Sequence, residues 1–588
     1  MNARKLFALA LVLVLAAGML FANAGQQSSG GGAATAYNLP RNETLYFNGL
    51  QWGAPRGNNP YGANTGCAFT TDGHRQTMYE TLFLFNQLDN KMYPQIADSY
   101  AWSGQTLTVQ LNPNVKFSDG SALTSADVVY CFELSKTYAI GASGMWDYLD
   151  SVAASGPTTV TFRAKSPFNP GAIEAQLCTF KITPRAYWEG KIRDGDLGRG
   201  ISDLAAFTAW DLIGSGPYSL MYYDDVKLVM IRNDNYWGQH RSRYGKLPAP
   251  KYLAHNIYST NAVGDAAMRR GEIDVSQQFV ASINTYFDVG VRTYIPQAPY
   301  YIPGTIPMIV FNTQRPGLDD KAVRKAIAMA LDYDMIGTNA MSGYTAPKQP
   351  HLMLPTPAEQ ALIDLDALRP HMWSGQDING ANALLDQAGW VRGADGIRAK
   401  GGVRLSFRVE CPEGWSDWNA ALEVVAQAGS RLGMDITTYF PQAPIWTDDL
   451  QSGNFDIIMN SPPGPGMDAP WNRARWVMSS DILSPPGQLN LIGNFGRWQN
   501  ARATALVNEL ASETTDAGKK RIWTELNQIY LDEMPAVGLM YRPWLFHQVG
   551  TTVWTGFPTF NDGSNIPPQI MIDGYGIRGL YNLSVARR

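Results

Sequence analysis

Mixed α/β domains are the fold class that this sequence predicts, because segments with strand periodicity alternate with segments of helical periodicity. The chain has 588 residues, too many for one hydrophobic core, so two to four domains are expected. Its composition is globular, with 45% hydrophobic and 17% charged residues. A net charge of −4 disfavours a general nucleic-acid binder, which would usually carry a basic face.

Residues 1–24 are expected to form an export signal. A short basic segment precedes an apolar run from Leu6 to Phe21, and Ala22-Asn23-Ala24 has the small-x-small pattern of a cleavage site. The apolar run is short for a membrane span, and no cysteine near the cleavage point offers a site for a lipid. Residues 25–37, rich in Gly, Ser and Ala, would form a tether. We therefore expect a periplasmic protein without a lipid anchor.

A strand, a tight turn and a capped helix are predicted in succession in the next part of the chain. Apolar residues alternate with polar ones from Leu107 to Leu111, which is the pattern of a half-buried strand. Ser118-Asp119-Gly120 then favours a turn, since Gly120 can take a positive φ. Thr124 is a good helix N-cap, and Asp127 three residues later completes a short version of the capping box.

The remaining elements follow from the same two periodicities. Strands are expected at residues 45–47, 218–223 and 273–275, helices at 266–270, 323–331, 384–388 and 419–432, and a short helix or turn at 77–84. Gly271 and Gly389 are placed to end two of these helices.

The sequence motifs between Pro94 and Tyr130 are PQIADSY, KFSDG and LTSADVVY. Together they resemble the signature of family 5 solute-binding proteins, the extracytoplasmic receptors of ABC importers for peptides, nickel and some oligosaccharides. Further matches follow in the family's order at residues 214–218, 233–237, 269–274, 323–328, 383–389 and 455–458. The resemblance covers about residues 40 to 545.

The resemblance implies an α/β, two-lobed periplasmic-binding-protein fold of class II, with an extra domain inserted in the N-terminal lobe. The implied domains are domain I at 38–80, 210–300 and 547–588, domain II at 81–209, and domain III at 301–546. It also implies a monomer that binds a small solute, delivers it to a transmembrane permease, and needs no cofactor and no catalytic residue.

Cysteine and histidine spacing gives no sign of a metal site, because neither CxxC nor HxxxH occurs. The four cysteines leave two alternatives open, one disulfide or four buried thiols; they are Cys67, Cys131, Cys178 and Cys411.

Residues 412–418, PEGWSDW, are the most informative segment for the ligand. Trp rings suit the apolar faces of a pyranose, and a carboxylate such as Asp417 accepts hydrogen bonds from hydroxyl groups. The alternative is that Asp417 caps the following helix and the rings belong to the core. This segment is similar to the cellobiose and cello-oligosaccharide-binding branch of the family.

That similarity implies five candidate ligand contacts: Trp52, Asn312, Trp415, Asp417 and Trp418. Four more are nominated for their aromatic or amide character: Tyr301, Trp471, Asn472 and Trp498. The expected ligand is therefore an oligosaccharide, such as cellobiose or a longer cello-oligosaccharide.

Two other functions are weighed against this one. Peptide receptors of the family carry an acidic residue in the loop corresponding to 461–470, and aligning on Pro470 places Gly466 there, although Asp468 could serve in another alignment. A secreted glycoside hydrolase would need two carboxylates about 5–10 Å apart. Asp417 and its neighbours Glu410 and Glu413 have no motif that places a partner opposite them.

Overall fold

A seven-stranded mixed sheet draws its strands from three separated parts of the chain, in the order β12-β23-β11-β1-β10-β9-β8. Its strands are β1 (Thr44–Asn48), β8 (Tyr218–Tyr223), β9 (Lys227–Arg232), β10 (Tyr252–Asn256), β11 (Val275–Ser276), β12 (Val291–Thr293) and β23 (Gln548–Gly550). Strand β1 runs parallel to β10 and β11, and the other pairs are antiparallel. Helix α8 (Asn261–Arg269) precedes β11.

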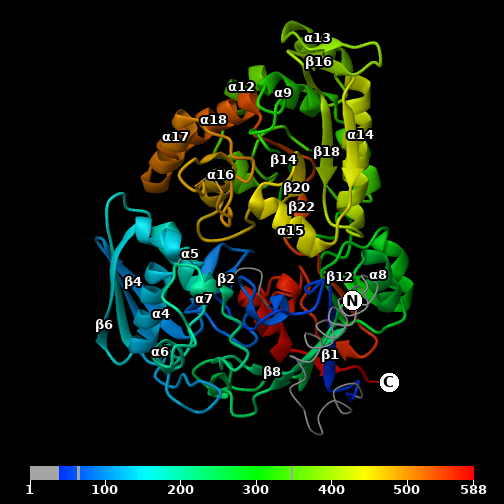
Figure 1. Cartoon of the computed structure of the whole chain (residues 1–588). Coiled ribbons are helices and arrows are strands. Elements are labelled where there is room, and N and C mark those ends of the chain that lie inside the picture. The colour runs from blue at the N-terminus through cyan, green and yellow to red at the C-terminus, as the bar shows by residue number, and fades with distance from the viewer. Residues whose placement is uncertain (1–38, 63–66, 139, 346–347, 486, 588) are drawn as a thin grey trace, which may run out of the picture. The chain divides into compact units, whose positions relative to one another are not determined.

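The structure is a computed structural model, which describes residues 39–62, 67–138, 140–345, 348–485 and 487–587 (Figure 1). The predicted export signal at 1–24 and tether at 25–37 lie outside these ranges. No helix in the described ranges has the length and apolar character to cross a membrane.

A four-stranded antiparallel sheet follows, in the order β4-β5-β7-β6. It contains β4 (Ala97–Ser103), β5 (Thr106–Leu111), β6 (Leu149–Gly156) and β7 (Thr159–Ala164), with helices α4 (Ser125–Thr137), α5 (Pro170–Thr179) and α6 (Arg185–Arg193). The predicted strand, turn and helix are confirmed here. Gly120 has a φ of +89°, and the Thr124 backbone N–H donates to the Asp127 carboxylate over 2.9 Å in a capping box.

The third large sheet is five-stranded, in the order β19-β18-β20-β14-β21. It contains β14 (Met308–Phe311), β18 (Ser406–Glu410), β19 (Asp435–Tyr439), β20 (Ile457–Asn460) and β21 (Ala536–Gly538). The longer helices associated with it are α9 (Lys321–Ala330), α13 (Ile378–Gln387), α14 (Ser416–Leu432), α15 (Ala443–Ser452), α16 (Trp471–Met478), α17 (Ala501–Ser512) and α18 (Asp516–Glu533).

Short elements complete the described chain. The small strands are β2 (Phe83–Asn86), β3 (Lys91–Pro94), β13 (Pro303–Thr305), β15 (Val391–Arg392), β16 (Arg398–Lys400), β17 (Val403–Arg404), β22 (Arg542–Pro543), β24 (Trp554–Thr555) and β25 (Ser584–Val585). The short helices are α3 (Ala68–Thr71), α7 (Asp203–Ala206), α10 (Tyr333–Met335), α11 (Pro357–Gln360), α12 (Leu365–Leu368), η1 (Ser143–Asp147), η2 (Trp237–Gln239), η3 (Ile283–Val289), η4 (Ile336–Ala340), η5 (Arg369–His371), η6 (Gln569–Met571) and η7 (Gly574–Tyr581). In the segment 77–84, where a short helix or turn was expected, residues 77–79 and 82 form bends, 80 and 81 have no regular structure, and 83 and 84 belong to β2. The strand expected at 273–275 begins at Val275.

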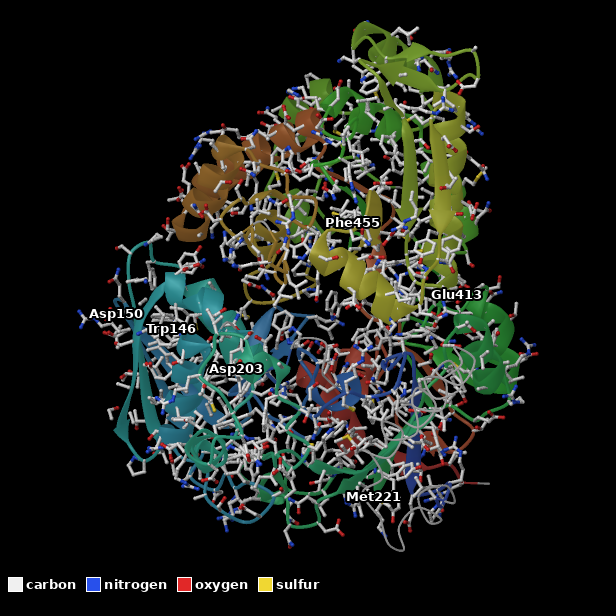
Figure 2. All side chains as sticks on the ribbon, viewed as in Figure 1. Trp146, Asp150, Asp203, Met221, Glu413 and Phe455 are labelled. Atoms are coloured by element: carbon white, nitrogen blue, oxygen red, sulfur yellow. The ribbon has the colours of Figure 1, made fainter. Side chains whose placement is uncertain are left out.

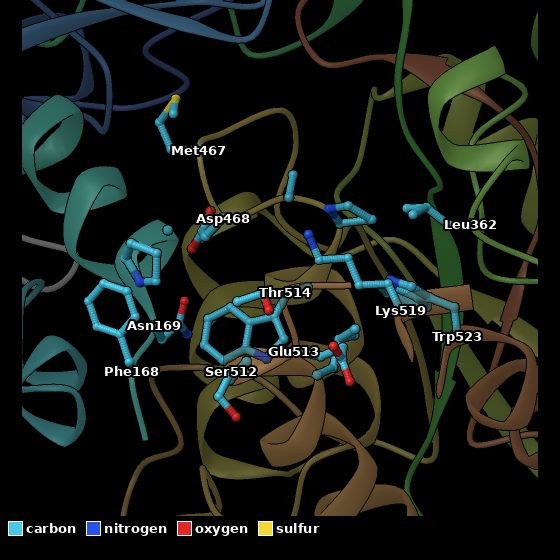
Figure 3. Close-up of a pocket in the computed structure, with 17 residues that line it drawn as sticks. Phe168, Asn169, Leu362, Met467, Asp468, Ser512, Glu513, Thr514, Lys519 and Trp523 are labelled. Atoms are coloured by element: carbon cyan, nitrogen blue, oxygen red, sulfur yellow. The ribbon is translucent and has the colours of Figure 1, made fainter. Parts of the chain in front are cut away.

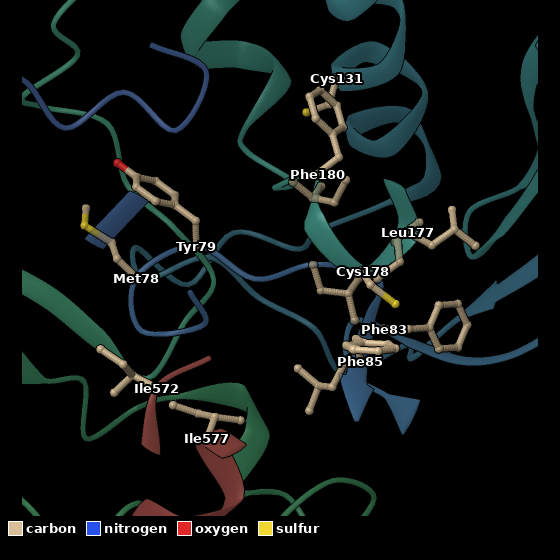
Figure 4. Packing of buried hydrophobic residues seen from close by; sticks show 14 of the residues in the cluster. Met78, Tyr79, Phe83, Phe85, Cys131, Leu177, Cys178, Phe180, Ile572 and Ile577 are labelled. Atoms are coloured by element: carbon tan, nitrogen blue, oxygen red, sulfur yellow. The ribbon is translucent and has the colours of Figure 1, made fainter. Parts of the chain in front are cut away.

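The five-stranded sheet separates two hydrophobic cores. Successive side chains of a strand point to opposite faces, so Ile309 and Phe311 of β14 belong to one core while Met308 and Val310 belong to the other. A further core joins the other two large sheets, and Figure 4 shows Phe83 of β2 with Leu177 and Cys178 of α5 within it. All four cysteines are free, buried thiols, which decides between the two alternatives left by the sequence.

Candidate functional site

Four tryptophan rings meet beside the N-terminus of α14. The ring of Trp415 lies 5.0 Å from that of Trp418, 5.7 Å from that of Trp52 and 5.8 Å from that of Trp446, measured between centroids. Trp52 comes from the loop after β1, and Trp446 comes from α15. We call these four residues the Trp cluster. The sequence analysis named three of its members as candidate ligand contacts. No motif indicated Trp446, which lies 31 residues beyond Trp415.

Unused hydrogen-bonding groups accompany these rings. The indole nitrogens of Trp418 and Trp446 and the Gln51 Oε1 atom are buried and have no hydrogen-bond partner among the described residues. A buried polar group without a partner costs about 1–3 kcal/mol, so a ligand hydroxyl that reached one of these atoms would gain a favourable hydrogen bond. Gln51 lines the cavity described next, whereas Trp418 and Trp446 do not. Indole N–H groups donate and an amide oxygen accepts, which matches both capacities of a hydroxyl group.

A cavity of about 250 Å³ adjoins the cluster. Its walls are the loop at residues 50–56, including Gln51 and Trp52, and the first half of α15, from Ala443 to Asp448. Both walls therefore also supply members of the Trp cluster.

His255 of β10 fixes the loop that carries Trp52. Its Nε2 atom accepts hydrogen bonds from the backbone N–H groups of Leu50 at 3.0 Å and Gln51 at 3.2 Å. Burial lowers the pKa of His255 to about 3, so the ring stays neutral at neutral pH and can act as this acceptor.

Hydrogen bonds join the start of α14 to α8 beside the Trp cluster. The Asn261 backbone N–H donates to the carbonyl of Gly414 over 3.1 Å, and its amide nitrogen donates to the Ser416 hydroxyl over 3.0 Å. Gly414 has a φ of +75°, and a Cβ atom there would lie 2.5 Å from the Cγ2 atom of Thr260. Only glycine fits this close approach, which positions Trp415.

Asp417 is engaged in an ion pair. It is 1% exposed, and its Oδ2 atom accepts a hydrogen bond from the Nε of Arg542 over 2.8 Å. The Arg542 guanidinium lies 4.4 Å from the ring centroid of Phe546. Asp417 also lies in the first turn of α14, where the helix dipole favours a negative charge.

Three other predicted contacts are buried. Asn312 donates to the carbonyls of Gly453 and Phe455 at 3.1 and 3.0 Å. The Tyr301 phenol donates to the amide oxygen of Gln548 over 2.9 Å, and Trp498 packs in the core at 5% exposure. Ligand contact by each of the nine residues remains a prediction.

Trp471 and Asn472, at the start of α16, lie in a different place. Both line a cavity of about 570 Å³, and Trp471 also lines one of about 380 Å³, shown in Figure 3. Asp468 lines both cavities, and its withdrawal from water raises its pKa to about 6.

Figure 2 draws the described side chains on the ribbon, with Glu413 of the loop before α14 labelled. The chain is similar to several known proteins. The family model described as bacterial extracellular solute-binding proteins, family 5 Middle, matches residues 91–483. Protein XP55 of Streptomyces lividans is 28% identical over 326 residues, which are 55% of this chain and 53% of that protein. The periplasmic murein peptide-binding protein MppA of Escherichia coli strain K12 is 22% identical over 476 residues, 74% of this chain and 78% of MppA.

Two solved structures extend the comparison. A mannohexaose-bound periplasmic oligopeptide-binding protein of an ABC transporter from Thermotoga maritima has a TM-score of 0.84 and 26% identity, covering 94% of this chain and all of its own. The oligopeptide-binding protein AppA of Bacillus subtilis, in complex with a nonapeptide, has a TM-score of 0.73 and 18% identity, covering 92% of this chain and 99% of its own. Both share the two-lobed periplasmic-binding-protein fold that the family resemblance implies.

Proposed function

The chain belongs to family 5 of the bacterial extracellular solute-binding proteins, and we propose that its solute is an oligosaccharide, such as cellobiose or a longer cello-oligosaccharide. Proteins of this family are extracytoplasmic receptors of ABC importers and not enzymes. Such a receptor makes or breaks no bond; it holds the solute while the open and closed populations of its lobes shift.

The Trp cluster is the observation that carries this proposal. Aromatic rings provide flat apolar surfaces, while two buried indole N–H groups and one amide oxygen lack partners in the described chain. A pyranose ring needs both a flat apolar surface and hydrogen-bonding groups, because its CH faces are apolar and its edge carries hydroxyl groups. The mannohexaose bound by the relative from Thermotoga maritima supports an oligosaccharide as the class of solute.

Peptides are the second candidate, because MppA and AppA are peptide-binding proteins by name. Asp468 could pair with a peptide ammonium group in the cavity that it lines. Its pKa of about 6, raised chiefly by burial, leaves it mostly ionised at pH 7.5, so it could form such a pair. Asp417 beside the Trp cluster is paired with Arg542, whereas Asp448 lines the 250 Å³ cavity and could also meet an ammonium group.

Calorimetric titration of the purified protein decides between the two. We expect binding of cellobiose, cellotetraose or both, with mannohexaose and an alanine tripeptide as comparison solutes. Trp415→Ala should weaken sugar binding roughly tenfold, because one stacking surface is lost. Trp210→Ala is the matched control, since Trp210 stacks on Tyr223 at 4.2 Å and lines none of the three cavities. Binding of the tripeptide with no binding of any sugar would refute the proposal.

A further inference from the structure

The contact between α5 and α16 is built differently from the contact between α8 and α14. Met268 of α8 and Trp418 of α14 are buried in one hydrophobic core, so these helices cannot separate without exposing that core to water. The α5 contact is a small cluster, in which Tyr148, Ala172 and Ala511 are buried. In Figure 1, α5 and α8 lie at opposite ends of the boundary between the part built on the five-stranded sheet and the rest of the described chain. The small contact is therefore the one that opens at lower free energy.

Two side chains from the segment at α16 reach across this small contact. The ring of Trp471 meets the Tyr148 ring edge to face, with centroids 5.8 Å apart at 80°. The Trp471 indole nitrogen donates to the carbonyl of Val507 over 2.9 Å, which fixes its ring. Met467, just before α16, packs against the core that joins the seven-stranded and four-stranded sheets. Side chains of the two parts thus interlock over a short stretch.

An ion pair lies beside these apolar side chains. The Nη2 atom of Arg475 in α16 is 3.7 Å from the Oδ2 atom of Asp147 in η1, and the Arg475 guanidinium is 5.6 Å from the ring centroid of Trp471. The Asp147 side chain is 66% exposed, so water screens the attraction and the pair is weak. A weak attraction suits a contact that breaks and forms again in each cycle of opening and closing.

Open space adjoins the contact on both of its sides. The cavities of about 380 and 570 Å³ both reach it, and Trp471 lines both of them. Protein interiors are normally packed to the density of organic crystals, so a contact between two cavities has few neighbours to hold it together.

We propose that the contact of η1 and α5 with α16 and α17 is a latch, which breaks when the receptor opens and whose strength sets the closed fraction before any solute binds. This inference goes beyond the proposed function, because the latch acts for whichever solute the receptor holds. The closed population encloses the solute, so the apparent Kd rises in inverse proportion to the closed fraction. Asp147 lines none of the three cavities, yet it then controls affinity by shifting a population.

Double electron–electron resonance measures the latch without any solute. Spin labels at Asp150→Cys, on β6, and Ala517→Cys, in the first turn of α18, report the separation of the two parts. Both positions are exposed, whereas the four natural cysteines are buried. Asp147→Lys turns the attraction to Arg475 into repulsion, so the ratio of the shorter to the longer distance should fall roughly threefold. Arg475→Glu should act in the same direction, and the double variant should restore the wild-type ratio because the two charges are exchanged.

Gly171→Ala tests the latch through shape alone. A Cβ atom at Gly171, in the first turn of α5, would lie 3.3 Å from the carbonyl oxygen of Met467, so the methyl group should wedge the contact open. Alanine favours a helix more than glycine does, so α5 itself is not weakened. Gly190→Ala in α6 is the matched control, because its Cβ would lie 3.8 Å from the Arg193 side chain, an ordinary contact. Only the first variant should shift the distances toward the longer population.

Titration of cellobiose into the same variants connects the latch to the solute. Asp147→Lys should weaken binding by the factor seen in the distances, about threefold. Asp225→Lys makes the same change of charge at an exposed position between β8 and β9, and it should alter neither the distances nor the affinity.

Several results would overturn the latch. They are a wild type without the shorter distance, an Asp147→Lys or Gly171→Ala variant with the wild-type ratio, and a double variant that stays as open as the single ones. Distances that shift while cellobiose affinity stays the same would also overturn it. A wild type that binds no sugar would overturn the proposed function alone, because the distance measurements use no sugar.

Discussion

At the scale of single residues, Asp417 illustrates how a structure changes the meaning of a sequence signal. The segment PEGWSDW made it a candidate hydroxyl acceptor, but its side chain is buried against Arg542, 125 residues further along the chain. Removing one partner of a buried ion pair leaves the other charge unpaired. We therefore predict that Asp417→Ala lowers the free energy of unfolding by about 3 kcal/mol.

Urea unfolding of Asp417→Ala, Arg542→Met and the double variant measures this pair as a thermodynamic cycle. The double variant should recover much of the loss, because no charge is left unpaired. Glu413→Ala, an exposed acid of the same loop, should change stability by less than about 0.5 kcal/mol. If Asp417→Ala is as stable as the wild type but binds no sugar, the residue is a ligand contact and not a structural one.

Glu410, at the end of β18, gives a prediction of pH dependence. Burial raises its pKa to about 7, against a partial opposing effect of Arg408, so the folded state holds this proton more tightly than the unfolded state. Stability from this group is therefore present at low pH and is lost as the pH rises through 7. Glu410→Gln cannot ionise, so the variant should gain stability relative to the wild type between pH 5.5 and pH 8. Thermal unfolding of both proteins at the two pH values measures this, and a difference that does not change with pH would contradict it.

Only part of the Trp cluster could be found from residue patterns. Trp415 and Trp418 were visible because they lie together in one short polar segment. Trp446 and Arg542 were not, because each reaches the site by long-range packing of α15 and β22, and a single sequence carries no record of such contacts.

At the scale of elements, the contact between α8 and the start of α14 sets the position of the Trp cluster. Gly414→Ala would place a Cβ atom 2.5 Å from Thr260 Cγ2, at a φ of +75° that L-residues disfavour. We predict a loss of about 1–3 kcal/mol of stability and a weaker affinity for sugar, because Trp415 follows directly. Gly401→Ala is a matched control, with a φ of +58° and open space around its Cβ position. It should lose stability through backbone strain alone and keep wild-type affinity, as calorimetric titration would show.

The capping box of α4 should behave differently, because it lies outside the Trp cluster and all three cavities. Thr124→Ala removes the cap hydroxyl and should cost about 1 kcal/mol of stability without a change in affinity. Urea unfolding and sugar titration of the same preparation measure both quantities. A fall in affinity would mean that α4 is coupled to the site.

Elements of this kind were predictable because their causes are local: alternating apolar residues, a turn glycine and a cap within a span of about 20 residues. Sheet order is not local. β14 pairs with β20 and β21, which lie about 150 and 230 residues away, and no periodicity specifies such partners. The two-lobed fold therefore came from the family resemblance, and the domain boundaries inferred in the same way stay a prediction.

At the scale of the whole molecule, a bound sugar should stabilise the folded chain by mass action. A ligand that binds only the native state adds RT ln(1 + [L]/Kd), which is about 2.7 kcal/mol at a hundred times Kd. The cavity at Trp52 is built from the loop after β1 and from α15, which belong to elements far apart in sequence, so the gain requires both to be folded. We predict that cellobiose raises the unfolding temperature of the wild type in proportion to the logarithm of its concentration.

The same cellobiose concentrations should produce a smaller shift in Trp415→Ala, because a tenfold larger Kd removes about 1.4 kcal/mol of that stabilisation. Trp210→Ala should shift as the wild type does, since its ring stacks on Tyr223 outside the cluster. Differential scanning calorimetry with sucrose as a non-binding osmolyte separates specific binding from general solvent effects. Equal shifts with cellobiose and sucrose would mean that the Trp cluster holds no sugar, and the four rings would then be a structural contact between α14, α15 and the loop after β1.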